Sequence, residues 1–365
     1  MEDKRTHALQ QRRIVEQLVF GKALKKRMKK LIIHIGYPKT ATTSMQLNFY
    51  AKMHEENKIE YLNHLNKKSS YLGDFYCRKT LSYVMGMSND FDFEEELEKI
   101  KLINNPISVI SNENISFFSE DYSMAIHNSN AKKNARRIRK IFSPYFDEIQ
   151  ILMFTRAQVT IIPSFYAQLF NHITSIQPRF KKMSKWLETN FFEVLTDSKI
   201  IFNYNLIYNS YVKEFGEDNV KVCLFEDLKH KQSSVLNTLS SLFCIDKGFV
   251  TKYAFQKNKK NVTIKNTLNQ IEASPSSLVN KLKYFYSKYL RFLIRPEKAK
   301  EIKIKLIKSV PNAILDLKFK NKSRGLTADE KLKVFKIYEK SNLELLNKLG
   351  YTRKEMIKYQ YLKAN

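Results

Sequence analysis

The sequence predicts an α/β fold in which a parallel β-sheet is flanked by helices on both faces. Short apolar runs, partly β-branched, recur with helical stretches between them, which is typical of buried parallel strands. These runs are residues 31–35, 107–110, 149–154 and 220–225. The chain has 365 residues but only 8 Gly and 8 Pro, which favours long helices over many short strands. We therefore expect one large α/β unit with additions to it.

The composition narrows the classes of partner. The formal net charge is +28, which favours anionic partners such as a nucleotide, an acidic polymer, a nucleic acid or an anionic membrane surface. Hydrophobic residues make up 43% of the chain and aromatic residues 13%, which excludes general disorder. Charge alone does not distinguish among these anionic partners. A lysine-rich surface can also reflect overall composition without any role in binding.

Cysteine usage and hydropathy indicate the compartment. Cys77, Cys223 and Cys244 are far apart and form no CxxC pair, which argues against a zinc site or a disulfide framework. Residues 1–30 lack the apolar stretch of a signal peptide, and the chain has no run of about 18 apolar residues. We therefore expect a cytoplasmic protein, and its basic surface would also suit the inner face of the membrane.

The predicted additions differ from the core in amino-acid composition. Residues 1–30 are predicted to form a basic helical extension, and residues 31–365 the α/β domain. Within that domain, residues 272–320 are predicted to be a basic, aromatic helical insertion, with apolar residues at helical spacing between lysines. Thr327 and Glu330 form a predicted capping box, which opens a helix that ends at Gly350.

The stretch IGYPKTATTS, residues 35–44, follows the first predicted strand and precedes a helix-compatible run that begins near Ser44. A helix N-terminus offers free N–H groups and a positive dipole end, so it favours an anion. Lys39 adds a full charge, and the threonine and serine hydroxyls add donors. The pattern predicts a P-loop-like phosphate-binding loop. It is not a Walker A loop, because Lys39 does not follow a second glycine, and this disfavours a nucleotide kinase.

The segment Tyr37-Pro38-Lys39-Thr40-Ala41-Thr42-Thr43 resembles the phosphosulfate-binding loop of the sulfotransferase family. That loop reads Tyr-Pro-Lys-(Ser/Thr)-Gly-Thr-Thr, so this chain departs from it at Ala41. Alanine lacks the access of glycine to positive φ, so we expect Ala41 in an ordinary backbone region. The resemblance implies that the loop holds the 5′-phosphate of a nucleotide cofactor through Pro38, Lys39, Thr40, Ala41, Thr42, Thr43 and Ser44.

A second segment supports the resemblance. Arg156 ends the third apolar run and Ser164 follows eight residues later, in a predicted helix. The family holds the nucleotide's 3′-phosphate with an arginine and a serine at this spacing, and a guanidinium fork suits a phosphate. The ordinary alternatives are a surface salt bridge for Arg156 and a helix cap for Ser164. Residues 215–228 and 341–350 also resemble the family's last core strand and the terminal helix of bacterial-type members, with Glu226 and Asp227 in structural roles.

The resemblance implies a sulfotransferase that uses 3′-phosphoadenosine 5′-phosphosulfate (PAPS) and no metal. It would transfer a sulfuryl group to a hydroxyl or amine of a carbohydrate acceptor, such as a surface polysaccharide or a glycolipid. Lys39 is the expected cation beside the leaving phosphate oxygen. Glu113, just past the second clear strand in a Ser-x-Glu segment like that of bacterial members, is the predicted general base, although it could be an ordinary loop carboxylate or a helix cap.

Weaker alternatives remain for individual residues. His34 lies inside the first predicted strand and is expected to be a packed core residue. His64, His127 and His172 fall in segments that could border the cleft. Three lysines could close over the 3′-phosphate or form a solvated run: Lys257, Lys259 and Lys260.

A different class of function also fits the composition. The net charge and the mixture of lysine and aromatic residues over 281–295 would suit a membrane-surface or nucleic-acid binding protein with a vestigial nucleotide site. No compact nucleic-acid motif is present, however, and both halves of the nucleotide site are intact. The sequence therefore favours the enzyme, with no specific nucleic-acid partner.

Overall fold

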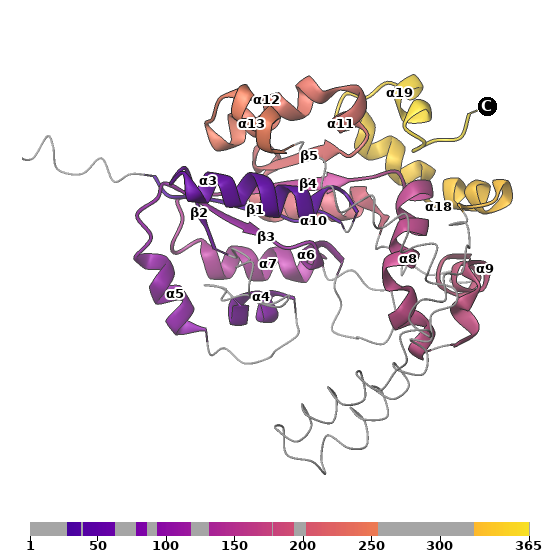
Figure 1. Cartoon of the computed structure of the whole chain (residues 1–365), viewed down its shortest axis with the longest axis horizontal. Helices are drawn as coiled ribbons and strands as arrows, with labels where there is room; N and C mark the ends of the chain where they lie inside the picture. The colour runs from indigo at the N-terminus through magenta and orange to yellow at the C-terminus, as the bar shows by residue number, and fades with distance from the viewer. Residues whose placement is uncertain are drawn as a thin grey trace, which may run out of the picture.

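The computed structural model describes residues 28–37, 39–62, 78–85, 93–117, 131–176, 178–192, 202–254 and 325–364. Over these residues the chain forms an α/β fold around a five-stranded parallel sheet with the strand order β2-β3-β1-β4-β5 (Figure 1). The strands are β1 (Lys30–His34), β2 (Glu60–Tyr61), β3 (Ile107–Ser111), β4 (Glu148–Thr155) and β5 (Val220–Leu224).

All four apolar runs are strands, which confirms the predicted fold class. β2 was not predicted, because two residues are too few to show a periodic pattern. The predicted N-terminal extension, apart from its last residues, and the predicted insertion at 272–320 lie outside the described residues.

The sheet separates two apolar clusters, as expected for strands with both faces covered. In β1, Leu31 and Ile33 face one cluster and Ile32 faces the other, and all three side chains are fully buried. β4 alternates in the same way, with Ile151 on the first face and Leu152 on the second.

The larger cluster contains side chains from most of the helices. These helices are α4 (Arg78–Val84), α5 (Glu94–Lys101), α6 (Asn114–Phe117), α7 (Ala131–Phe142), α8 (Gln158–Ile176), α9 (Met183–Leu187), α10 (Tyr204–Phe215), α18 (Ala328–Lys348) and α19 (Arg353–Lys358). The smaller cluster packs on the opposite face under the π-helical segment η1 (Met45–Tyr50), α3 (Ala51–Glu55), α12 (Gln232–Phe243) and α13 (Lys247–Ala254). In Figure 1, α12 and α13 lie above the sheet, α3 crosses in front of it, and α4, α5 and α7 lie below it.

Short elements complete the described chain: α2 (Thr42–Ser44), α11 (Asp227–His230), the 3-10 turns η2 (Pro178–Lys181) and η5 (Glu217–Asn219), and the π-helical turn η3 (Glu188–Phe192). The predicted capping box is present at the start of α18, where Thr327 Oγ1 accepts from the N–H of Glu330. α18 ends at Lys348, and Gly350 takes a positive φ of 77° just beyond it. Within the described ranges, no helix combines the length and the apolar character that a membrane span requires.

Because all strands are parallel, their carboxyl ends meet at one edge of the sheet. Pairing continues past the strand ends there: the N–H of Ile35 donates to Leu152 O (2.9 Å), that of Asn112 to His34 O (3.0 Å) and that of Phe225 to Thr155 O (2.8 Å). The loops that follow β1, β3, β4 and β5 are therefore fixed beside one another, where ligands of open α/β sheets bind.

Candidate functional site

The loop after β1 has the predicted order of strand, loop and helix. α2 begins at Thr42, two residues before the expected start, and runs directly into η1 and α3. The first N–H groups of a helix have no acceptor in a preceding turn. Among the described residues, the N–H groups of Ala41, Thr42 and Thr43 donate no recorded hydrogen bond. Pro38, which the sequence placed in the same loop, lies outside the described residues.

The buried threonine hydroxyls of the loop hold its shape. Thr40 Oγ1 donates to Tyr37 O at 2.5 Å, and Thr42 Oγ1 lies 3.1 Å from the same carbonyl. Both side chains are buried, whereas that of Thr43 is exposed. Ser44 Oγ lies 3.5 Å from Ala254 O, on the side of α13. The free backbone N–H groups, more than the hydroxyls of Thr40 and Thr42, are thus available to an anion.

The expectation for the backbone of Ala41 is wrong. Ala41 has φ 70° and ψ 10°, in the left-handed region, and Lys39 has φ 68°. The chain must reverse between β1 and α2 within a few residues, and the contacts to Tyr37 O hold it in this tight turn. The left-handed conformation costs a non-glycine residue about 1–2 kcal/mol. The position at which the sulfotransferase loop has glycine is therefore left-handed in this chain as well, with alanine in place.

Gly36 allows the loop to lie close to His34. A Cβ atom at Gly36 would be 2.8 Å from His34 Nε2 and 3.2 Å from the hydroxyl oxygens of Thr40 and Thr42. His34 is fully buried, and burial lowers its pKa to about 3. Its Nδ1 lies 2.9 Å from Ser111 Oγ. His34 is thus a neutral core residue that supports the loop, as the sequence predicted, and not a solvent-facing base.

Lys39 and Glu113 are near enough for the charge of each to influence the pKa of the other. Both side chains are partly buried. Burial lowers the pKa of Lys39, and the Glu113 carboxylate opposes that shift. Burial raises the pKa of Glu113, while Lys39 and a hydrogen bond from Thr42 lower it. No hydrogen bond or ion pair to the Lys39 ammonium is recorded within the described residues, which leaves the group available to an anionic ligand.

The backbone of Glu113 is anchored to the same loop. Ser116 Oγ lies 2.9 Å from Glu113 O and 3.2 Å from Gly36 O, so it ties the start of α6 to the end of β1. Ser116 is fully buried in α6, and its role was not predicted, because a single serine in a short helix carries no sequence signal of its own.

Arg156 follows β4 and lies beside the loop. Its Nη1 donates to Lys39 O at 3.0 Å, which holds the left-handed turn from the carbonyl side. Its guanidinium stacks over the ring of Phe225, 4.7 Å from the ring centre. Its positive charge also lowers the pKa of Lys39, so the two cations share one environment. Arg156 and Lys39 thus place two cations beside the free N–H groups of the loop, an arrangement that favours an anion.

Ser164 lies in the interior of α8, with Pro163 before it in the same helix, so it is not an N-terminal cap. Thr160 lies one turn earlier on the same face of α8, and its Oγ1 accepts from Arg156 Nε at 3.0 Å. Thr160 is a contact of Arg156 that was not predicted, because a single threonine in a helix has no distinctive sequence pattern.

One predicted loop residue, Pro38, and several weaker alternatives cannot be placed. Pro38, His64, His127, Lys257, Lys259 and Lys260 lie outside the described residues, and so does the side chain of His172. The structural role predicted for Glu226 is confirmed, because its Oε1 accepts from the N–H of Ala157 at 3.1 Å and it precedes α11.

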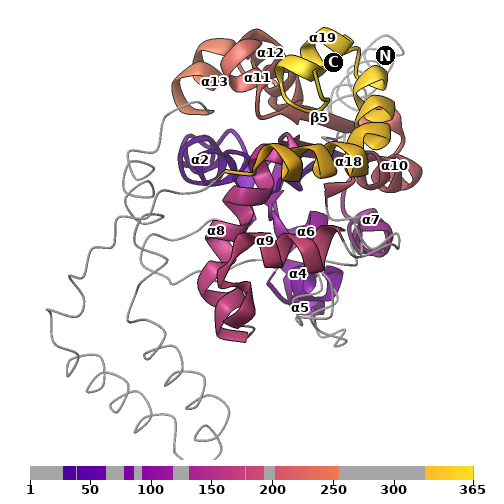
Figure 2. The same cartoon turned by 90° about the vertical axis from the view of Figure 1, so that its right-hand side faces the viewer.

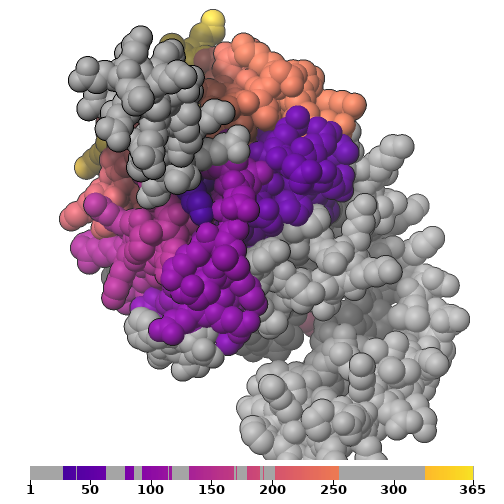
Figure 3. All heavy atoms as spheres, turned by 90° about the vertical axis from the view of Figure 1, so that its left-hand side faces the viewer, coloured from indigo at the N-terminus to yellow at the C-terminus, as the bar shows by residue number. Residues whose placement is uncertain are grey.

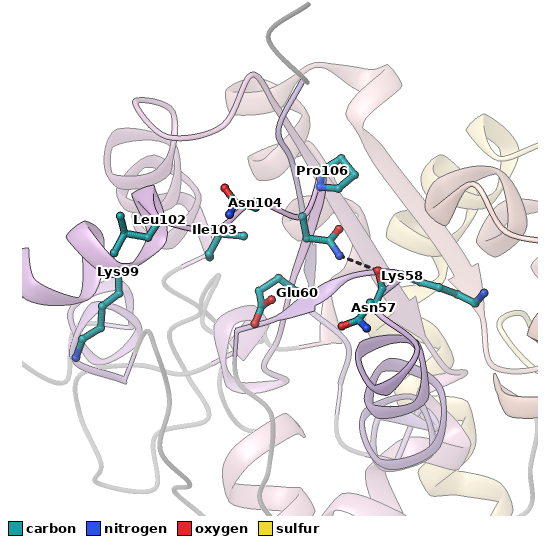
Figure 4. A pocket seen from close by; sticks show the side chains of 9 residues that line it. Asn57, Lys58, Glu60, Lys99, Leu102, Ile103, Asn104 and Pro106 are labelled. Carbon is teal, nitrogen blue, oxygen red and sulfur yellow. Dashed lines mark hydrogen bonds between the residues drawn. The ribbon is translucent and has the colours of Figure 1, made fainter. Parts of the chain in front are cut away.

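A cavity of about 810 Å³ lies at the opposite edge of the sheet. It is lined by the end of α5, the turn before β2 and the approach to β3, and Asn105 Nδ2 donates there to Asn57 O at 3.1 Å (Figure 4). Figure 3 views the molecule from the side of Figure 1 on which α5 lies. None of the predicted site residues lines this cavity, so it is separate from the carboxyl edge.

Comparison with known proteins adds little to this geometry. No protein-family model matches the chain, and no curated protein matches its sequence. Among solved structures, a sulfotransferase from Alicyclobacillus acidocaldarius aligns with 78% of this chain and 98% of its own, at 15% identity and a TM-score of 0.37. An alignment at that TM-score does not identify a function.

Proposed function

We propose that the protein is a PAPS-dependent sulfotransferase that acts on a carbohydrate. The observation that carries this proposal is the gathering of Lys39, Glu113 and Arg156 at the N-terminus of α2, on loops from three different strands. The resemblance of residues 37–43 to the phosphosulfate loop supports the choice of nucleotide.

The residues present fit such a nucleotide. The free N–H groups of Ala41, Thr42 and Thr43 and the ammonium of Lys39 would hold its 5′-phosphate. Arg156, Thr160 and Ser164 would hold its 3′-phosphate, since the recorded bonds of Arg156 use two of its five N–H donors. The nucleotide would supply the sulfuryl group, and the protein would supply charge and orientation.

Lys39 would stabilise the negative charge that grows on the leaving phosphate oxygen as its bond to sulfur breaks. Its partial burial strengthens that interaction, because a site with less water screens charge less. Glu113 would accept the proton of the acceptor hydroxyl, or amine, as the new bond to sulfur forms. Its raised pKa makes it a stronger base than an exposed glutamate, which favours removal of the acceptor proton.

The net charge of +28 supports an anionic or lipid-linked acceptor, such as a surface polysaccharide or a glycolipid, with peripheral contact at the inner membrane face. The competing proposal, a basic binding protein with a vestigial site, depends on residues 281–295, which lie outside the described residues. No described feature favours it.

The test is calorimetric titration of the purified protein with adenosine 3′,5′-bisphosphate, the nucleotide that remains after transfer, and with ATP. We expect micromolar binding that is selective over ATP and that Arg156→Ala abolishes. Arg139→Ala is a matched control, because Arg139 is an exposed arginine that bonds to Glu214 on the helix surface. Absence of binding by the unaltered protein, or loss of binding in both variants, would contradict the proposal.

A further inference from the structure

The turn from β4 into α8, which carries Arg156, is held by segments far away in the sequence. Thr155 O accepts from the N–H of Phe225 at 2.8 Å, and Arg156 O accepts from the hydroxyl of Tyr204 at 2.5 Å. The N–H of Ala157 donates to Glu226 Oε1 at 3.1 Å. Three successive residues of this turn therefore have partners outside it.

Tyr361 joins the two sides of this arrangement. Its side chain is 1% exposed. Its hydroxyl donates to Glu226 Oε2 at 3.1 Å and lies 3.2 Å from Thr155 Oγ1. One hydroxyl thus connects the side chain of Thr155, just before Arg156, with the carboxylate that holds Ala157, just after it.

Tyr361 is fixed in place by the surrounding C-terminal elements. Its N–H donates to Met356 O and its carbonyl accepts from Asn342 Nδ2, each at 2.9 Å. α19 is attached to the junction of α11 and α12 by an ion pair between Glu355 and Lys231. Figure 2 shows α19 beside α11 and α12, and α18 beside α8. The position of the Tyr361 hydroxyl is therefore set by the fold and not by a free side chain.

Glu226 provides the electrostatic link to Arg156. Burial raises the pKa of Glu226, whereas the hydrogen bond from Tyr361 and the charge of Arg156 lower it. The Glu226 carboxylate in turn raises the pKa of Arg156 against the effect of burial. The hydroxyl of Tyr361 thus favours the ionised carboxylate that attracts the guanidinium.

We propose that Tyr361 is a positioning residue for Arg156, acting through Glu226 and Thr155 to hold the guanidinium where it would bind the 3′-phosphate. This inference rests on the proposed function. In this view, the position of Arg156 depends on a residue about 200 positions away in the sequence.

The test compares two nucleotides. Adenosine 3′,5′-bisphosphate carries the 3′-phosphate, and adenosine 5′-phosphate lacks it. Tyr361→Phe removes the hydroxyl and keeps the ring in the core. We expect the variant to bind the bisphosphate about tenfold more weakly, because hydrogen bonds to charged groups are the strong ones, and to bind adenosine 5′-phosphate as the unaltered protein does. Thr155→Val, which removes the other hydroxyl, should give the same selective loss if Tyr361→Phe does not fold.

Two controls separate positioning from a general structural effect. Tyr208→Phe removes a similar bond, from a buried tyrosine to Glu217 Oε1 at 3.2 Å, and should change neither affinity. In the Arg156→Ala background, Tyr361→Phe should have no further effect on the bisphosphate. Equal weakening of both nucleotides, or a persistent effect without Arg156, would overturn the inference.

A second measurement keeps the inference testable if the unaltered protein binds no bisphosphate, a result that would count against the proposed function alone. The Arg156 Nε–H donates to Thr160, so its exchange with solvent, followed by NMR of arginine-labelled protein, reports how well the guanidinium is held. Tyr361→Phe should speed this exchange and Tyr208→Phe should not. Unchanged exchange in Tyr361→Phe would contradict the inference.

Discussion

Lys39 keeps a positive charge in a place where burial opposes it. We predict that Lys39→Met, which keeps most of the aliphatic length, lowers turnover at least about 100-fold, because the lost charge acts on the transition state. Thermal unfolding should change little, since the ammonium makes no recorded bond within the described residues. Steady-state assays with labelled PAPS would measure the loss, with Lys52→Met as the control, because Lys52 is a partly exposed lysine of α3 that pairs with Glu55 and Glu56. Near-normal turnover in Lys39→Met would contradict the mechanism.

The proposed role of Glu113 as general base predicts how activity depends on pH. The folded protein raises its pKa, so kcat/KM should rise with pH as this carboxyl loses its proton. Glu113→Gln should lose about 100-fold in turnover together with that acid limb.

The raised pKa of Glu113 should affect stability in the opposite direction from activity: activity rises with pH, whereas stability falls. A raised folded pKa favours the protonated carboxyl, so its contribution to stability is present at low pH and is lost as pH rises through that pKa. Glu113→Gln should therefore unfold at a higher temperature than the unaltered protein at neutral pH, with the difference shrinking in acid. An inactive variant with lower stability at neutral pH would indicate a structural carboxylate instead.

Ala41 and Ala51 provide a matched pair. Ala41 has a φ of 70°, whereas Ala51 lies in the helix with a φ of −59°. Ala41→Gly should stabilise the fold by about 1 kcal/mol, because glycine enters the left-handed region without strain. Ala51→Gly should destabilise it by about 1 kcal/mol, the usual effect in a helix interior. Denaturant unfolding would measure both, and a loss of stability in Ala41→Gly would show that the turn carries no strain.

At this scale the sequence predicted where the candidate residues lie in the fold, but not the residues that support them. Lys39, Arg156 and Glu113 lie where their spacing after apolar runs indicated. Thr160 and Tyr204 contact Arg156 and were missed, because a single threonine in a helix or a tyrosine at a helix start has no distinctive pattern. The left-handed Ala41 was predicted wrongly, since residue type alone argued against a conformation that the tertiary contacts impose.

At the scale of elements, α8 and α18 are joined by a buried pair of amides. Gln158 Nε2 donates to Asn342 Oδ1 at 2.9 Å, and Asn342 Nδ2 donates back to Gln158 Oε1 at 3.0 Å. Both side chains are nearly inaccessible. The pair fixes the first turn of α8, and with it the turn that carries Arg156.

We predict that Asn342→Leu alone destabilises the fold by about 2 kcal/mol, because it removes the donor to the buried Gln158 Oε1 and to Tyr361 O, while Gln158 Nε2 keeps its bond to Phe202 O. The double change Gln158→Leu with Asn342→Leu should cost less than the sum of the two single changes. Urea unfolding of the four proteins measures the coupling. Additive effects would mean that the two amides act independently.

The elements themselves were predicted unequally. The capping box at Thr327 and Glu330 identified the start of α18, because the motif is local. The amide pair could not be predicted, since Gln158 and Asn342 are 184 residues apart and each resembles an ordinary polar residue of a helix.

At the scale of the whole molecule, the net charge of +28 should attract anionic ligands over long distances. We predict that the affinity for adenosine 3′,5′-bisphosphate falls roughly tenfold between about 0.05 and 0.5 M NaCl, because salt screens this attraction. Neutral adenosine should bind with little dependence on salt. Equal salt dependence of the two ligands, measured by titration, would exclude charge as the cause.

The fold class followed from the sequence because each buried parallel strand is a short apolar run, and the alternation in β1 and β4 places side chains on both faces. The two-residue β2 and the bond from Tyr361 to Glu226 depended on contacts between distant parts of the chain, which no local pattern encodes.

The bond between Thr155 and Tyr361 spans 206 residues, and this separation has a consequence for biosynthesis. At ordinary translation rates the ribosome needs about 10–40 s to advance from one residue to the other. During that interval the β4–α8 turn emerges without the tyrosine that completes it. The contacts that hold the β4–α8 turn should thus be completed late in synthesis, well after the strands of the sheet have emerged.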